Sequence, residues 1–156
     1  MDLSEVSDIV RLLILVAESL LVVVLAIIFY FLLHKTKFKN LKWIHQQIII
    51  GIVFGAASIF GTEMGVDNGI AIANVRDAGP LVAGLVFGGP AGVIAGTIGA
   101  GERLLSTFVF GKGYYSVIAC TVATFLCGLY AWALRRWFFE NKTPHWLFGF
   151  ATAAIM

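Results

Sequence analysis

Residues 79–106 form a glycine-rich apolar stretch that limits the possible folds more than any other part of the chain. Glycines recur there at every fourth position, at Gly84, Gly88, Gly92 and Gly96. One face of a helix with this spacing is bare backbone, which a neighbouring helix can approach closely. Pro90 follows the flexible pair Gly88-Gly89 and lacks an amide hydrogen, so it suits the first turn of a new helix. We therefore predict two apolar helices that meet in a tight bend at Gly88, Gly89 and Pro90.

The composition places the chain in the membrane class. Of its 156 residues 60% are hydrophobic and 13% are charged, and the mean hydropathy is +0.92, which is far from the averages of soluble domains. The net charge of +2 is small and scattered, so a nucleic-acid partner is not expected. We expect an all-α fold, a polytopic helical membrane bundle that contains the broken helical hairpin and contacts the lipid bilayer.

Charged residues beside the apolar runs predict the topology. Residues 9–33 are long and apolar enough to cross a bilayer, and the acidic residues before them lack the features of a removable signal peptide. Basic side chains follow at once, at His34, Lys35, Lys37, Lys39 and Lys42. By the positive-inside rule this cluster is cytoplasmic and the N-terminus is outside. Residues 44–60 then return outward to a polar outer loop.

The next apolar run decides whether residues 79–106 cross once or turn back. Residues 114–134 form a further span that ends in Arg135 and Arg136, a second cytoplasmic mark. A single crossing by residues 79–106 would place these arginines outside, whereas a hairpin places them inside. At 1.5 Å per residue the two arms are roughly 13 Å and 25 Å long, so we expect the bend to be sheltered by other helices.

Residues 146–156 open another span but supply about half of the length that a crossing needs. We therefore expect the sequence to be part of a longer protein. We divide it into residues 1–40, an extra N-terminal transmembrane helix with a basic cytoplasmic loop, and residues 41–156, a receptor domain truncated in its later helices.

The sequence contains no recognisable catalytic motif, so we expect no enzyme activity in this segment and no cofactor or metal site. The three histidines, His34, His45 and His145, fall near predicted cytoplasmic ends, where histidine is usually an interfacial residue. Cys120 and Cys127 lie in an apolar segment, where cysteine usually packs as a small hydrophobe.

Arg76 and Arg103 are the strongest candidates for ligand binding. The hairpin places both at the outer ends of adjacent helices, and two guanidiniums side by side need an anion such as a small carboxylate. The remaining candidates for this site are Asn74, Ser106 and Tyr115. The alternative is that the arginines only form salt bridges, with Asp77, Glu63 or Glu102 as partners.

Glu18 lies inside the first apolar run, where a carboxylate is costly and usually faces the interior of a bundle. Two interpretations remain open for it. Glu18 either forms a proton or cation site, or it pairs with Arg11 or with polar groups of other helices, which we favour.

The string from Asn74 to Gly92, with its Asn-x-Arg pair and its Gly-Gly-Pro bend, resembles the signature of the LytS/YhcK-type five-transmembrane receptor domain. The match continues to Arg103, 27 residues after Arg76, and the wider similarity covers residues 41–156. The resemblance implies a sensor in the bacterial cytoplasmic membrane, joined to a cytoplasmic histidine kinase or diguanylate cyclase, with the cyclase branch preferred. It also implies a small extracellular ligand such as pyruvate.

Two acidic residues depart from the pattern of the kinase branch. Asp77 follows Arg76 directly, and Glu102 directly precedes Arg103. Negative charge beside each guanidinium weakens binding of a singly charged carboxylate and favours a zwitterion or a larger polar ligand.

Two other functions are compatible with the sequence. One is a substrate-binding membrane subunit resembling the S-components of vitamin transporters, which also use short helices broken by glycine and proline. The other is a structural module without a ligand, in which the repeated glycines form a homodimer. The repeat is more simply explained by packing inside one protomer.

Overall fold

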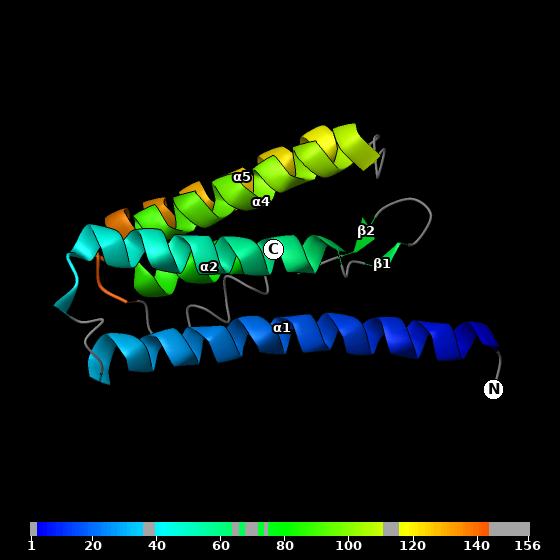
Figure 1. Cartoon of the computed structure of the whole chain (residues 1–156), viewed down its shortest axis with the longest axis horizontal. Coiled ribbons are helices and arrows are strands. Elements are labelled where there is room, and N and C mark those ends of the chain that lie inside the picture. Colours follow the sequence, from blue (N-terminus) through cyan, green and yellow to red (C-terminus); the bar gives the residue numbers. More distant parts are fainter. Residues whose placement is uncertain are drawn as a thin grey trace.

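The structure is a computed structural model that describes residues 3–35, 40–63, 66–67, 72–73, 75–110 and 116–143. Helices account for most of the described residues, and Figure 1 shows them lying side by side. The elements in chain order are α1 (Leu3–Lys35), α2 (Trp43–Glu63), β1 (Val66–Asp67), β2 (Ile72–Ala73), α3 (Ala78–Val82), η2 (Ala83–Phe87), α4 (Gly89–Phe110) and α5 (Val117–Trp137). The expected all-α membrane bundle is confirmed.

Three helices among the described residues are long and apolar enough to cross a membrane: Leu12–Lys35, Trp43–Glu63 and Val117–Trp137. Each ends two or three residues beyond the predicted span, because a helix continues into its polar flank once the apolar segment is helical. The start of the last predicted span and residues 146–156 lie outside the described residues. Most large apolar side chains of α1 face outward, as expected of a helix surrounded by lipid.

Helix α4 lies at the centre of the bundle and packs against both α2 and α5. Glycines on all three helices allow the backbones to approach. A Cβ on Gly51 of α2 would lie 2.7 Å from the Cβ of Ile94, and a Cβ on Gly128 of α5 would strike the carbonyl of Gly92. Small residues serve the same purpose in many membrane interfaces, where close van der Waals packing replaces the hydrophobic effect.

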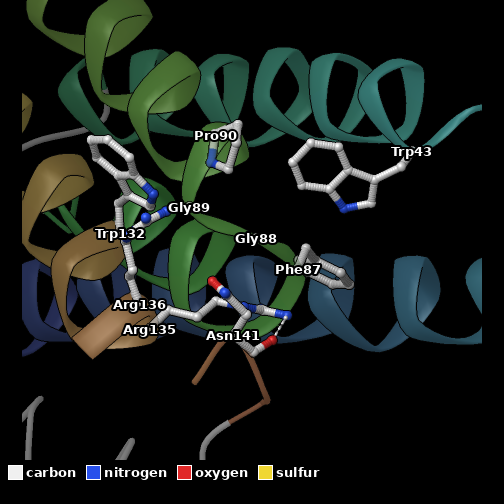
Figure 2. Close-up of a pocket in the computed structure, with 9 residues that line it drawn as sticks. All are labelled: Trp43, Phe87, Gly88, Gly89, Pro90, Trp132, Arg135, Arg136 and Asn141. Atoms are coloured by element: carbon white, nitrogen blue, oxygen red, sulfur yellow. Dashed lines mark hydrogen bonds between the residues drawn. The ribbon is translucent and has the colours of Figure 1, made fainter. Parts of the chain in front are cut away.

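The chain between Ala78 and Phe110 forms two helical arms with a break at Gly88 (Figure 2). The first arm is one turn of α-helix followed by a π-helical turn, and the second arm is α4. Gly88 has φ 155° and ψ 147°, a conformation that L-residues rarely adopt. A Cβ on Gly92 would lie 2.6 Å from the Cα of Gly84, so the arms touch through their glycines. The second arm ends at Phe110, four residues beyond the predicted Ser106.

Gln47 of α2 forms hydrogen bonds to the backbone on both sides of the break in the hairpin. Its side-chain Nε2 donates to the carbonyl of Phe87 at 3.1 Å, and its Oε1 accepts from the amide of Ala91 at 3.3 Å. The Gln47 side chain is 2% exposed. Backbone groups that a broken helix frees at membrane depth must find a partner inside the protein, and one amide side chain provides it for two of them.

An aromatic cluster joins α1 and α2 to the first arm. The ring centroids of Phe54 and Phe87 are 5.6 Å apart, and Phe29 lies 6.1 Å from Phe54 and 6.3 Å from Phe87. The rings are tilted or edge-on, the arrangements that aromatic pairs prefer. This cluster holds the π-helical end of the first arm between α1 and α2.

The segment between α2 and α3 contains a small antiparallel ladder in which Val66 pairs with Ala73 and Asp67 with Ile72. We predicted only a polar loop there. The two strands have two residues each, too few for the alternating pattern that identifies a strand in a sequence.

We predict that Gln47→Leu destabilises the protein by about 2–4 kcal/mol, because the Phe87 carbonyl and the Ala91 amide each lose their side-chain partner in a buried position. The unfolding midpoint of the purified protein in detergent measures this. Gln46→Leu is the matched control, since the Gln46 side chain bonds the carbonyl of Leu41 in an exposed position. Equal midpoints for the two variants would contradict the role given to Gln47.

Candidate functional site

Arg76 and Arg103 are both buried near one end of the bundle, with 3% and 2% of their surface exposed. Arg76 lies two residues before α3, where its backbone packs against Gly61 of α2: a Cβ on Gly61 would be 3.3 Å from the Arg76 amide nitrogen. Arg103 belongs to α4. Glu102, its neighbour in the chain, is within electrostatic reach of both arginines. The fold therefore brings both arginines to the same end of the hairpin.

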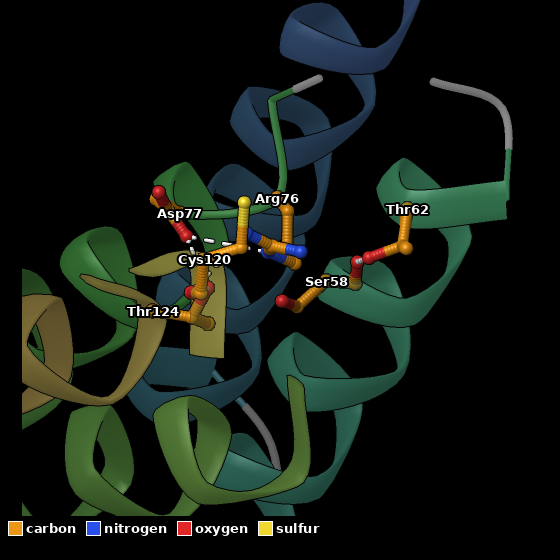
Figure 3. A network of polar contacts seen from close by, with 6 residues as sticks. All are labelled: Ser58, Thr62, Arg76, Asp77, Cys120 and Thr124. Carbon is orange, nitrogen blue, oxygen red and sulfur yellow. Dashed lines mark hydrogen bonds and ion pairs between the residues drawn. The ribbon is translucent and has the colours of Figure 1, made fainter. Parts of the chain in front are cut away.

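Arg76 belongs to a network that links the start of α3 to α5 (Figure 3). Its Nε lies 3.4 Å from Oδ1 of Asp77, and its Nη2 donates to the carbonyl of Cys120 at 3.4 Å. The hydroxyl of Thr124 donates to the same Asp77 oxygen at 2.6 Å and lies 3.0 Å from the Cys120 carbonyl. The salt bridge with Asp77, which we kept as an alternative, is thus present.

Arg103 is bound to the residue directly before α5. Its Nη2 donates to the hydroxyl of Ser116 at 3.3 Å. Cys120 and Thr124 follow Ser116 at intervals of four residues, so the three lie along the side of α5 that meets Asp77 and the arginines. Ser116 and Thr124, two hydroxyl residues on one side of an apolar segment, are a signal that we overlooked in the sequence.

The α2 side of this end is polar too. Thr62 donates to the carbonyl of Ser58 at 3.2 Å, and its hydroxyl is also within hydrogen-bonding reach of the carboxylate of Glu102. The Ser58 hydroxyl is buried against Gly99 of α4, where a Cβ would strike it, and has no hydrogen-bond partner among the described residues. We define the polar layer as the two arginines together with Ser58, Thr62, Asp77, Ser116 and Thr124. Sequence reasoning missed Ser58, Thr62, Ser116 and Thr124.

A cavity of about 590 Å³ opens beside the polar layer. Ser106 lines it together with Glu63 and Glu102, and neither arginine does. Ser106 is 4% exposed, and its hydroxyl has no hydrogen-bond partner among the described residues. Asn74 and Tyr115, the other two predicted site residues, lie outside the described residues.

Glu18 faces the interior of the bundle from α1 and is 5% exposed. Neither of its oxygens forms a hydrogen bond of good geometry among the described residues. The backbone of Val75, next to Arg76, nevertheless lies close to its carboxylate. The side chain of Arg11, its expected partner, lies outside the described part. Glu18 therefore lies close to the loop that carries Arg76.

The remaining candidates are the histidines and the two cysteines. His34 is exposed at the end of α1, where its ring lies 2.8 Å from the carbonyl of Tyr30, and His145 is outside the described residues. Cys127 is buried and Cys120 half-buried, and both are free thiols. In the described residues no three His, Cys, Asp or Glu side chains gather in a metal-binding group.

A family model described as "5TMR of 5TMR-LYT" matches residues 27–156. The chain belongs to the LytS-type five-transmembrane receptor family. The match covers the hairpin, both arginines and α5. No curated protein matches the chain, and no solved structure matches it.

Membership of the LytS-type receptor family makes this chain a membrane sensory domain of signalling proteins and not a catalytic module. Together with the three apolar helices it makes the chain a multi-pass membrane protein in contact with the bilayer.

We predict that Thr124→Val lowers the free energy of unfolding by about 1.5–3 kcal/mol, because the fully buried Thr124 hydroxyl donates to a charged carboxylate. Valine has nearly the same shape, so little packing is lost. The control is Thr97→Val, since the exposed Thr97 hydroxyl bonds only the Val93 carbonyl in its own helix. Thermal unfolding in detergent compares the two, and an equal effect of both substitutions would refute the Asp77 network.

Proposed function

We propose that this domain senses a small extracellular metabolite that carries a carboxylate, and that it controls a cytoplasmic output module. The observation that carries the proposal is the burial of two guanidiniums, those of Arg76 and Arg103, at one end of a broken hairpin. Burying a charge costs free energy unless hydrogen bonds or an opposite charge balance it. A bound carboxylate supplies such an opposite charge. Membership of a sensory family favours binding.

The surroundings of the arginines support a carboxylate that also bears a positive or polar group. The forked guanidinium matches the two oxygens of a carboxylate. Asp77 contacts Arg76, and Glu102 lies within electrostatic reach of both arginines, so the site already contains negative charge. A zwitterion such as an amino acid fits these charges better than a monocarboxylate such as pyruvate, and both belong to the proposed class.

We place this site on the outer face of the bacterial cytoplasmic membrane. The basic residues at the other end, Arg135 and Arg136 in the last turn of α5 and Lys35 in that of α1, support a cytoplasmic position for that end. The N-terminus is then outside, residues 1–40 are an extra helix with a basic loop, and residues 41–156 are the receptor domain. The output module is a diguanylate cyclase or a histidine kinase.

The signal passes through α5. Arg76 donates to Cys120 of α5, and Arg103 donates to Ser116, the residue directly before α5. A carboxylate that binds the guanidiniums competes for these bonds and draws the loop before α3 toward α4. Helix α5 then shifts against the glycines of α4, and this movement reaches the cytoplasmic end as a small helix displacement of the kind that switches use.

We predict that pyruvate or an amino acid raises the unfolding midpoint of the full-length membrane region, and that Arg103→Gln weakens the binding at least about 30-fold, because one buried charged partner of the carboxylate is lost. Arg76→Gln acts in the same direction. A thermal-shift titration against small carboxylates, amino acids and vitamins measures both effects.

Two further variants make this titration decisive. Arg103→Lys keeps the positive charge but loses the two-pronged hydrogen bonding of the guanidinium, so it weakens binding less than Arg103→Gln does. Lys142→Gln removes an exposed cation at the other end of α5 and leaves binding unchanged. Stabilisation by a vitamin and not by any carboxylate, or binding that survives the loss of both arginines, would overturn the proposal.

A further inference from the structure

A second cavity lies at the opposite end of the bundle from Arg103 (Figure 2). It has a volume of about 510 Å³ and is lined by the bend of the hairpin, by the start of α2 and by the end of α5 and the residues after it. The side chains that matter here are Trp43, Trp132, Arg135 and Arg136. None of them belongs to the carboxylate site.

Arg135 is fixed in this cavity by two backbone carbonyls. Its Nη1 donates to Leu85 in the first arm at 2.8 Å, and its Nη2 donates to Asn141 at 3.2 Å. The Asn141 amide donates in turn to the Arg135 carbonyl at 2.8 Å. Both partners are neutral backbone carbonyls, so the guanidinium is held in one position and they do not neutralise its positive charge.

The cavity as a whole is positive. Among the described residues no carboxylate forms an ion pair with Arg135 or Arg136, and the nearby Glu140 contacts Lys142 at 3.9 Å instead. Helix α4 begins at Gly89 in the cavity wall, so the positive end of its dipole adds to the field. The cavity therefore attracts an anion.

An apolar groove of about 590 Å³ adjoins the positive cavity. It is lined by Leu129, Trp132, Ala133, Arg136 and Trp137. Trp132 and Arg136 line both hollows, so the two are direct neighbours. A ligand that fills both has an anionic head and an apolar tail.

The depth of the cavity in the membrane matches such a ligand. The α2 span begins at Trp43 and the α5 span ends at Trp137, so the cavity opens where the apolar spans meet the headgroups, and its wall at Gly88 lies about one helical turn deeper, beside Gln47. Tryptophan is enriched at this level, and basic pockets between helices there bind anionic headgroups.

We propose that this cavity and groove form a binding site for an anionic phospholipid, with the phosphate between Arg135 and Arg136 and an acyl chain along Trp132 toward Leu129. The lipid joins the bend of the hairpin to the end of α5. The site stands independently of the proposed sensory ligand, because it shares no residue with the Arg76 and Arg103 layer.

Native mass spectrometry of the purified chain in detergent, titrated with phosphatidylglycerol or phosphatidylcholine, tests this proposal. Phosphatidylglycerol binds at least about fivefold more tightly, and Arg136→Gln lowers its affinity about fivefold, as expected for one interfacial charge. Arg136 is exposed, so its substitution leaves the fold intact. Lys142→Gln is the matched control, because it removes an equally exposed cation outside the cavity.

Two further arms identify the ligand class. Glycerol 3-phosphate, a soluble headgroup without a chain, does not displace the lipid, and Ala133→Phe, which fills the groove, weakens lipid binding. Equal affinity for both lipids, equal loss in Arg136→Gln and Lys142→Gln, displacement by glycerol 3-phosphate, or unchanged binding in Ala133→Phe would each overturn the proposal. Circular dichroism verifies that each variant is folded.

Discussion

The hairpin at the centre of this receptor depends on two hydrogen bonds from Gln47. A chain that turns back inside a bilayer frees backbone groups that lipid cannot satisfy, and Gln47 binds the Phe87 carbonyl and the Ala91 amide on either side of Gly88. Because these backbone groups have a partner, the two arms can meet through their glycines, and α4 can pack closely against both α2 and α5.

The two ends of the bundle differ in their polar contacts. At one end Arg76, just before the hairpin, donates to Cys120 of α5, and Arg103 of α4 donates to Ser116, directly before α5. At the other end Arg135 of α5 reaches back to the Leu85 carbonyl of the first arm. Hydrogen bonds therefore connect both ends of α5 to the hairpin and the residues beside it. A ligand that changes the contacts at one end moves a helix whose other end is also bound.

The fold class and the family could be predicted from the sequence, because apolar runs, basic flanks and the Gly-Gly-Pro string are local features. The partners of the buried polar groups could not. Gln47 meets residues 40 and 44 positions away, and Thr124 meets Asp77 across 47 positions, distances at which no local pattern reports a contact. The polar surroundings of the arginines could be predicted only in part for the same reason. Arg76 and Arg103 are prominent in the sequence, whereas Ser58 and Thr124 look like ordinary small residues of apolar helices.

The central claim is that residues 78–110 enter and leave the membrane on the same face. Single cysteines at the exposed positions Glu63 and Lys142, in a chain whose Cys120 and Cys127 are replaced by alanine, test it with a membrane-impermeant maleimide applied to intact cells. The hairpin predicts that the two positions lie on opposite faces, with Glu63→Cys labelled at once and Lys142→Cys labelled only after the membrane is opened. Labelling of both cysteines in intact cells would mean a single crossing and would contradict the account.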